Sequence, residues 1–232
     1  MLIFEWLYQK IGYFVHIFIL ESADRYIVRF DNHMSKQGKQ YIKKAYILAM
    51  KIHYGQYRGD GVTSYFTHCL DVGNYISVEL GIKNNWEINA SALLHDTVED
   101  GDISIDTIKK IFGSVVAHWT DLMTKTENKA TYIPRMLRAK IIEVFILKLS
   151  DRVVNLRTLG MKAEPEFQIR QINETIEIFL PMADLLIDLI AKSEKWQNRK
   201  YIGLHIKAAL ENQILSFRAE FGDRIISITD DH

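Results

Sequence analysis

Hydrophobic residues recur at intervals of three and four along most of the chain, the spacing that places them on one face of an α-helix. The first clear segment runs from Lys36 to about Tyr54. Its apolar positions are Ile42, Ala45, Tyr46, Ala49 and Met50. Three glycines between residues 55 and 61 then interrupt the period and predict a loop.

The same spacing predicts further helices, separated by polar or glycine-containing segments. In chain order these cover residues 65–80, 86–98, 104–113, 115–123 and 134–156. Pro134 fits the first turn of the last of them, because the N–H that proline lacks has no helical partner there. The β-branched run at residues 144–149 is interpreted as part of that helix, since the helical period continues past both of its ends.

Helices are also predicted for the remainder of the chain. Pro165 precedes one of them, Pro181 predicts a kink, and the final segment runs from about Ser193 to Phe221. The sequence shows neither the alternation typical of strands nor an internal repeat of about 20 to 50 residues. We therefore expect an all-α fold, a helical bundle of roughly eight to ten helices with an extra N-terminal helix.

The N-terminal stretch is rich in aromatic and aliphatic side chains but is interrupted by Glu5, Lys10 and His16. The uninterrupted apolar part is shorter than the roughly 20 residues that a membrane-spanning helix needs. It also lacks the basic segment and cleavage site of a signal peptide. We interpret residues 1–33 as an apolar extension that packs or binds a partner, ahead of a domain at residues 34–232. Contact with a membrane surface and a non-native extension are the alternatives, and Met34 is an alternative start.

The amino-acid composition limits the kinds of function that we expect for the protein. Of the 232 residues, 48% are hydrophobic and 25% are charged, as in a folded domain with a sizeable core. Lysine plus arginine equals aspartate plus glutamate at 29 each, so we expect no nucleic-acid partner and only local affinity for phosphate. The single cysteine, Cys69, excludes an intramolecular disulfide and is typical of a reducing compartment, so a cytoplasmic location is expected.

Candidate chemistry is concentrated in the segment Ala90 to Asp100. There His95 and Asp96, and then Glu99 and Asp100, follow a short apolar run. Burying an imidazole and three carboxylates costs free energy unless a cation or proton donors compensate. A metal ion is the simplest compensation.

A metal site draws its ligands from several elements, and two other predicted helices supply a histidine and an aspartate. The expected ligands are His68, His95, Asp96 and Asp151. Mixed nitrogen and oxygen ligation of this kind suits Mn²⁺, Fe²⁺, Co²⁺ or Zn²⁺.

The chain also carries a series of short motifs in a defined order. They are His53-Tyr-Gly-Gln-Tyr-Arg58, Tyr65-Phe-Thr-His68, Ala92-Leu-Leu-His-Asp-Thr-Val-Glu-Asp100, Ile111-Phe-Gly-Ser-Val-Val, Met123-Thr-Lys125, Leu147-Lys-Leu-Ser-Asp-Arg152 with Asn155-Leu-Arg-Thr-Leu159, and Asn173-Glu-Thr-Ile-Glu-Ile-Phe-Leu-Pro-Met-Ala183. With these motifs the chain resembles the HD-domain hydrolase half of RelA/SpoT proteins and the stand-alone small alarmone hydrolases. The resemblance covers roughly residues 36–183.

This resemblance implies metal-dependent removal of the 3′-pyrophosphate from guanosine tetra- or pentaphosphate (ppGpp or pppGpp), yielding GDP or GTP and pyrophosphate. It implies Mn²⁺ as the metal, with Glu99 and Asp100 as the catalytic residues that align and deprotonate a water. The part of the chain after Ala183 is too short for the synthetase domain that many relatives carry, so the expected match is to the single-domain hydrolases.

The resemblance also implies a set of residues near a nucleotide substrate. They are Arg58, Tyr65, Thr124, Lys125, Asn155 and Arg170. Arg58 is expected to face the base, because guanidinium groups stack on bases, and Lys125, Asn155 and Arg170 are expected to face phosphates or ribose. His53 lies on the core-facing period of its predicted helix and is interpreted as structural.

Three positions depart from the family pattern, namely Gly59, Ser64 and Cys69. The loop expected to hold the base is therefore altered, and an adenosine alarmone (ppApp), another phosphorylated nucleotide or NADPH is an alternative substrate. A non-catalytic nucleotide-binding or partner-binding module, with the N-terminal extension forming a possible homodimer, is the alternative from a different class. The intact set of expected ligands and acids favours the enzyme.

Overall fold

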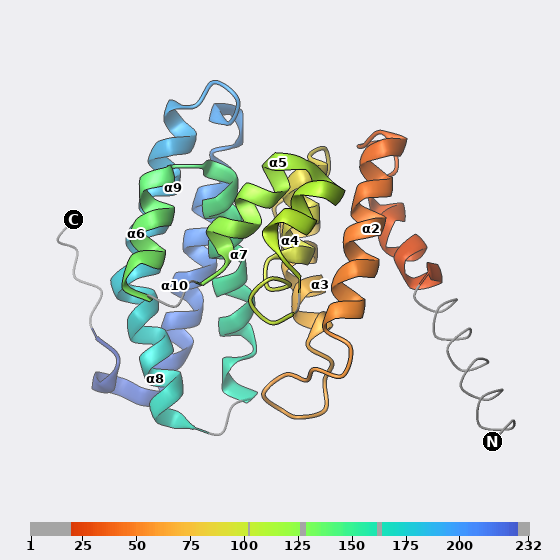
Figure 1. Cartoon of the computed structure of the whole chain (residues 1–232). Helices are drawn as coiled ribbons and strands as arrows, with labels where there is room; N and C mark the ends of the chain where they lie inside the picture. The colour runs from red at the N-terminus through yellow and green to blue at the C-terminus, as the bar shows by residue number, and fades with distance from the viewer. Residues whose placement is uncertain (1–19, 102, 126–128, 162–163, 227–232) are drawn as a thin grey trace, which may run out of the picture.

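The computed structural model describes residues 20–101, 103–125, 129–161 and 164–226, and the regular structure in these ranges is helical (Figure 1). The α-helices are α2 (Lys36–Ile52), α3 (Phe66–Asn74), α4 (Trp86–Leu94), α5 (Ile105–Met123), α6 (Lys129–Ala139), α7 (Ile142–Arg157), α8 (Pro165–Glu174), α9 (Leu180–Lys192) and α10 (Tyr201–Phe221). Two π-helical segments, Tyr75–Glu79 and Thr175–Phe179, extend α3 and join α8 to α9. The predicted all-α fold is confirmed.

Three helices begin at residues whose side chains cap them. Ser35 accepts a hydrogen bond from the backbone N–H of the third residue of α2, Asn85 does so for α4, and Ser104 does so for α5. Each cap satisfies one N–H that has no partner within its helix, and this fixes where the helix starts. The predicted starts at residues 36, 86 and 104 are thus confirmed to within one residue.

Of the breaks between helices, one is predicted correctly and one is missed. The break at Gly113 is confirmed, because this residue has a φ of 85° and divides α5 into two helical pieces. The single helix predicted for residues 134–156 is wrong: Lys140 adopts a φ of 50°, which ends α6 and lets α7 begin at Ile142. Pro134 lies inside α6 and not in a first turn. The period hid this break because α6 and α7 contribute buried residues to the same hydrophobic cluster.

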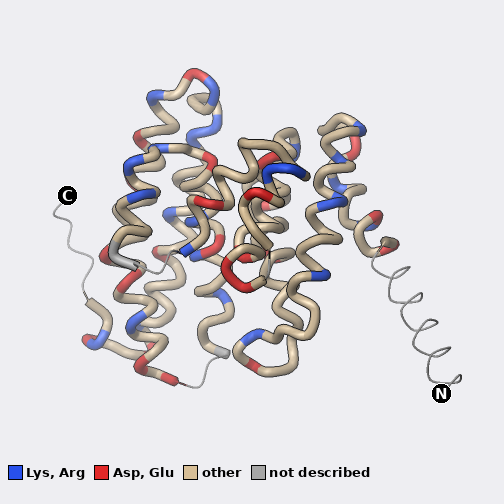
Figure 2. The backbone as a smooth tube through the Cα atoms, viewed as in Figure 1, with Lys and Arg blue, Asp and Glu red and all other residues tan. Residues whose placement is uncertain are grey.

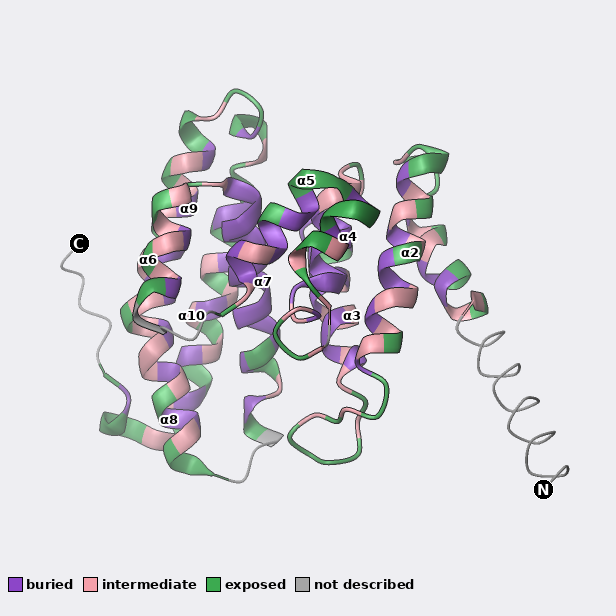
Figure 3. Cartoon of the chain, viewed as in Figure 1, coloured by how far each residue is buried: buried purple, intermediate pink, exposed green. Residues whose placement is uncertain are grey.

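Two hydrophobic clusters form the core. One joins α2, α3 and the first half of α5, and the other joins α7, α9 and α10. Helix α4 contributes to both, with Ala92 in one cluster and Leu93 in the other. Helix α7 is buried along most of its length, as Figure 3 shows. Polar residues on α3, α4 and α7 therefore lie between two apolar masses, where an unpaired charge is costly.

Part of the predicted N-terminal extension packs on the domain. Residues 20–27 are helical, and Ala23, Tyr26 and Phe30 are buried in the same cluster as α2. The ring of Tyr26 lies 5.2 Å from that of Tyr46 on α2, measured between centroids. Residues 1–19 lie outside the described ranges, so the boundary at residue 33 and the partner role stay predictions. Within the described part of the chain, no helix combines the length and the hydrophobicity needed to cross a membrane.

Candidate active site

Helices α3, α4 and α7 bring three expected ligands together. His68 lies in the first turn of α3, His95 directly follows the last residue of α4, and Asp151 lies in the middle of α7. The Nε2 atom of His68 lies 3.2 Å from Nε2 of His95 and 3.1 Å from Oδ1 of Asp151. All three side chains are buried. These three residues form a group that could hold a metal ion, as the HD-domain motif predicts.

The fourth expected ligand, Asp96, lies beside this group. Its Oδ2 atom is 3.1 Å from Nε2 of His95 and 3.7 Å from Nε2 of His68. The hydroxyl of Tyr65 donates a hydrogen bond of 2.6 Å to the same oxygen. Tyr65, expected near the substrate, therefore contacts a candidate ligand directly and holds its carboxylate in place.

The hydrogen bonds and the charges of this group favour the binding of a cation. His95 Nδ1 lies 2.8 Å from the carbonyl oxygen of Ala92, which can only accept, so Nδ1 carries the hydrogen and the Nε2 of the neutral ring has a lone pair facing His68. Burial alone would lower the pKa of His95, but the carboxylates of Asp96 and Asp151 raise it to about 9. Despite burial, His95 holds the pKa of the Asp96 carboxyl below its ordinary range, and Lys148, with smaller effects from His68 and His95, does the same for Asp151. The cluster thus requires a positive charge at its centre, which a proton or a metal ion supplies.

Asp151 is supported by two neighbours on its own helix. Lys148, three residues earlier, donates a hydrogen bond of 2.8 Å to Oδ2, and Asn155, four residues later, donates one of 2.6 Å to Oδ1. Lys148 is only 7% exposed, and Asp151 raises its pKa although burial opposes this, so it is a permanent cation. Lys148 is not among the residues expected at this site from the sequence. A lysine within an otherwise apolar run three positions before an expected ligand was the available signal.

The expected catalytic acids lie in the turn after α4. The prediction that this helix continues to residue 98 is wrong: it ends at Leu94, and the hydroxyl of Thr97 donates a 2.7 Å hydrogen bond to the carbonyl of Leu94. A side chain that pairs with a backbone carbonyl in this way competes with helix continuation. Figure 2 shows acidic positions, in red, gathered in the segment that follows α4.

Glu99 and Asp100 differ in their surroundings. Both carboxylate oxygens of Glu99 accept hydrogen bonds from Lys125, one from Nζ at 2.7 Å and one from the backbone N–H at 3.2 Å. Burial, together with the nearby carboxylates of Asp96 and Glu99, raises the pKa of Asp100 above its ordinary value. Asp100 therefore binds a proton more readily than an isolated aspartate, the property that a general base near neutral pH requires.

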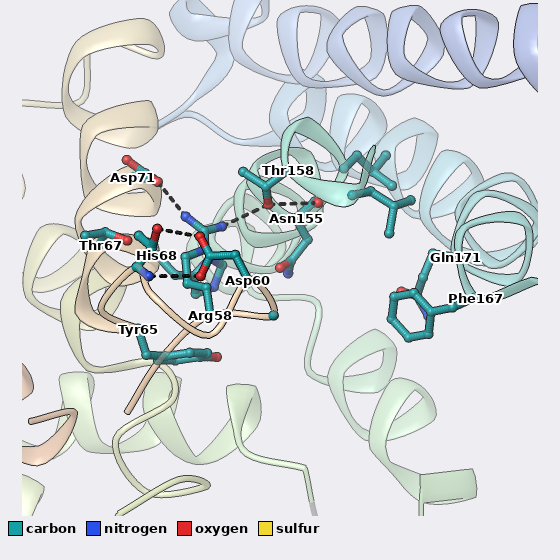
Figure 4. A pocket seen from close by; sticks show the side chains of 14 residues that line it. Arg58, Asp60, Tyr65, Thr67, His68, Asp71, Asn155, Thr158, Phe167 and Gln171 are labelled. Carbon is teal, nitrogen blue, oxygen red and sulfur yellow. Dashed lines mark hydrogen bonds and ion pairs between the residues drawn. The ribbon is translucent and has the colours of Figure 1, made fainter. Parts of the chain in front are cut away.

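A cleft of about 500 Å³ opens beside His68, and we name it the Arg58 cleft (Figure 4). Arg58 donates hydrogen bonds of 3.1 Å to Asp71 on α3 and 2.9 Å to Thr158 at the end of α7, so its guanidinium group is fixed between the two elements. Phe167 and Gln171 of α8 line the opposite side. Besides Arg58, the expected substrate residues Tyr65 and Asn155 line this cleft, as does Gly59.

Three other residues considered in the predictions, Thr124, Arg170 and His53, are not part of the cleft lining. Thr124 uses its hydroxyl to donate to the carbonyl of Thr120 at the end of α5. Arg170 is exposed on α8, and its guanidinium carbon lies 5.7 Å from the centroid of Phe167 without being part of the cleft lining. His53 is buried, and its Nδ1 lies 2.6 Å from Oε1 of Gln56, in agreement with the structural role predicted for it.

Comparison with known proteins identifies the family. The model of the HD domain matches residues 45–186, more than half of the chain. The chain belongs to the HD-domain family.

Within this HD-domain family, the chain is 35% identical over 159 residues to a GTP pyrophosphokinase of Myxococcus xanthus, a match that covers 62% of this chain and 20% of that protein. It is 29% identical over 181 residues to the bifunctional (p)ppGpp synthase/hydrolase SpoT of Escherichia coli K12, covering 73% of this chain and 25% of that protein. The chain thus spans a quarter or less of these relatives. The expected relationship to RelA/SpoT hydrolase domains is confirmed.

A solved structure shares the fold of this HD-domain protein. It is described as a metazoan ortholog of SpoT that hydrolyzes ppGpp, and it superimposes with a TM-score of 0.55 at 22% identity. The match covers 79% of this chain and 96% of the solved one. At this identity the likeness establishes the helical HD-domain architecture.

Proposed function

We propose that this HD-domain protein removes the 3′-pyrophosphate from ppGpp or pppGpp in a metal-dependent hydrolysis that yields GDP or GTP and pyrophosphate. The observation that carries the proposal is the buried group of His68, His95 and Asp151, which adjoins both Asp100 and a cleft that fits part of a nucleotide. The (p)ppGpp activities in the names of the relatives agree with this substrate.

A divalent cation is the proposed cofactor, with His68, His95 and Asp151 as ligands and Asp96 as the fourth. Mn²⁺ is the ion that the family resemblance favours, and Fe²⁺, Co²⁺ or Zn²⁺ also suit this donor set. When bound, such an ion lowers the pKa of water and neutralises charge on a phosphoryl oxygen.

Residues of the chain are proposed to orient the water and to transfer its proton. Hydrolysis joins a water oxygen to the 3′-phosphorus and breaks the bond between that phosphorus and the ribose 3′ oxygen. We assign Asp100 to accept one proton of the water, and this proton is the one that the departing ribose oxygen requires. Glu99, which is held in place by the hydrogen bond from Lys125, orients the water. Proton transfer by a positioned side chain of this kind contributes about 10²- to 10⁴-fold to a rate.

Nucleotide binding is proposed to involve both sides of the Arg58 cleft. The Arg58 guanidinium, immobilised by Asp71 and Thr158, offers a flat face on which a base can stack at little cost in conformational entropy. Asn155 lines the cleft and also contacts Asp151, so it lies where the ribose would meet the candidate metal group.

Incubation of the purified chain with Mn²⁺ and ppGpp tests the proposal. We expect equal amounts of GDP and pyrophosphate, and loss of both products with His95→Ala. His118→Ala is the matched control, because this histidine is exposed on α5 and distant in sequence from the candidate ligands. A folded, Mn²⁺-loaded protein that releases no pyrophosphate would contradict the proposal and favour the non-catalytic alternative.

An alternative substrate is supported by one observation, the presence of Gly59 in the lining of the Arg58 cleft. A glycine supplies no side chain to contact a guanine, so ppApp, another phosphorylated nucleotide or NADPH is the second candidate. Competition between guanine and adenine substrates in one reaction tests the base preference. If the adenine substrate is hydrolysed faster, it replaces the guanine substrate in the proposal.

A further inference from the structure

The candidate metal group lies between two cavities with opposite charge balance. Among the described residues, the lining of the Arg58 cleft contains one cationic side chain, Arg58, and two carboxylates, Asp60 and Asp71. A second cavity of about 420 Å³, which we name the Lys148 cavity, has a different balance. In the part of its lining that the structure describes there are three cationic side chains and two carboxylates, namely Lys125, Lys148, Arg152, Asp151 and Glu174.

The two cavities meet at the candidate metal group. His68 belongs to the lining of the Arg58 cleft, and Asp151 belongs to that of the Lys148 cavity. Asn155 and Gln171 line both cavities. A substrate whose reacting phosphorus lies at the metal group can therefore extend one part into each cavity.

We infer that the Lys148 cavity binds the departing pyrophosphate, while the Arg58 cleft binds the nucleoside. This assignment rests on the proposed function, since pyrophosphate is the product that leaves from the 3′ side. In that reaction the bond between the 3′-phosphorus and the ribose oxygen breaks, so the two products separate at the boundary between the cavities.

The cations of the Lys148 cavity are held in fixed positions before any ligand binds. Arg152 donates hydrogen bonds of 2.8 Å to Gln171 and 2.6 Å to Glu174, and its guanidinium carbon lies 3.8 Å from the centroid of the Phe179 ring. Lys148 is fixed by Asp151. Both cations are less than 10% exposed, so they act on an anion with little screening by water. Preorganised charge of this kind costs no rearrangement when a polyanion enters.

Lys125 lies at the entrance of the same cavity. Its side chain is 47% exposed, and its Nζ pairs with Glu99. The ammonium group can therefore contact a pyrophosphate at the solvent side while Arg152 and Lys148 act from the interior. Because Glu99 is also proposed to orient the water, Lys125 links the position of the attacking water to the pyrophosphate that contains the attacked phosphorus.

The Arg58 cleft is poorly suited to the same anion. Both oxygens of Asp60 accept hydrogen bonds within its own loop, two of them from backbone N–H groups, so this carboxylate stays charged. Asp71 pairs with Arg58, the one cation in the described lining of the cleft. Two carboxylates against one guanidinium repel a pyrophosphate but accept hydrogen bonds from the N–H groups of a base.

Equilibrium binding of the two products tests the assignment. The full chain is loaded with Mn²⁺ at a buffered free concentration, and the dissociation constants of pyrophosphate and GDP are measured separately and together. We expect Lys125→Met and Arg152→Gln each to weaken pyrophosphate binding by about ten-fold while GDP binding changes less than two-fold. Arg58→Met is the matched control and should weaken GDP binding alone.

Several outcomes would overturn the assignment. These are no pyrophosphate binding by the loaded wild-type chain, unchanged pyrophosphate binding in both variants, or competition between GDP and pyrophosphate for one site. Lys125→Met decides if Arg152→Gln fails to fold, because Lys125 is a surface residue. The proposed function fails separately, since a chain that releases pyrophosphate from ppGpp but shows any of these outcomes keeps its activity and loses only the cavity assignment.

Discussion

Lys148 Nζ donates a 2.8 Å hydrogen bond to Oδ2 of Asp151, and this leaves Oδ1 of the same carboxylate facing His68 at 3.1 Å. The lysine therefore decides which oxygen is directed to the candidate metal group. It does so from a buried position on the same helix, one turn away. A contact to a ligand's second oxygen usually fixes the ligand's orientation and tunes its affinity for metal.

Lys148→Met is predicted to raise the dissociation constant for Mn²⁺ by about 10- to 100-fold, because Asp151 would lose the contact that orients it. Metal titration of the stripped protein measures this change. The control is Lys207→Met. It removes an exposed ion pair between Lys207 on α10 and Asp184 on α9 and should leave Mn²⁺ affinity unaltered. Equal affinities for the two variants would show that the lysine has no part in metal binding.

Tyr65→Phe is predicted to slow turnover by about ten-fold while the protein stays folded, since only the hydrogen bond to Asp96 is removed. Steady-state kinetics and the thermal midpoint are measured together. Tyr57→Phe is the matched variant, because Tyr57 is 59% exposed. A Tyr65 variant as active as the wild type would mean that Asp96 needs no support from this hydroxyl.

Asp100→Asn is predicted to lower kcat by at least about 100-fold with bound Mn²⁺ unchanged, because the variant loses the proton acceptor but none of the candidate ligands. In the wild type, the acid limb of the pH profile should lie above the ordinary pKa of an aspartate, since burial, Asp96 and Glu99 raise the pKa of Asp100. Stopped assays across the pH range and elemental analysis provide the two readouts. Near-normal turnover in the asparagine variant would remove Asp100 from the mechanism.

The metal-stripped protein is predicted to lose stability as the pH rises. The pKa of His95 is raised from 6.5 to about 9 in the folded protein, so the bound proton stabilises the fold fully below pH 6.5, and this contribution disappears as the pH passes 9. The loss is on the order of 3 kcal/mol. Denaturant midpoints of stripped protein between pH 6 and 9.5 measure it.

Adding Mn²⁺ should reverse this dependence, because deprotonated His95 is the form that binds a metal. A stripped protein whose midpoint is constant or rises over this range would contradict the charge balance of the candidate metal group. His205 is a useful reference position in this experiment: it is 45% exposed, so His205→Ala should leave the pH dependence in place.

Much of the helical layout was predictable because the signals were local. The serine before Lys36 caps α2, and Gly113 divides α5, as the period and the glycine predicted. The break at Lys140 was not predictable, because this residue adopts a left-handed conformation between two helices that both contribute to one hydrophobic cluster. Leu94 ends α4 for a reason that the hydrophobic pattern does not contain, the pairing of its carbonyl with Thr97.

At the candidate site, too, the features with a local sequence signal were predictable and those that depend on tertiary packing were not. His68, His95 and Asp151 were predictable as a set, because each stands on an apolar helix where an unpaired polar group needs a partner. Arg170 was placed near the substrate by resemblance, whereas the structure leaves it exposed on α8. The role of Lys148 depends on how α7 packs beneath Phe179 and Tyr132, and this packing joins residues far apart in the chain.

The most direct test of the central claim is anomalous X-ray scattering from crystals of the Mn²⁺-loaded protein. The account predicts one strong manganese peak between Nε2 of His68, Nε2 of His95 and Oδ1 of Asp151, and its absence in His95→Ala crystals. A map with no peak there, or with manganese bound only elsewhere, would contradict it.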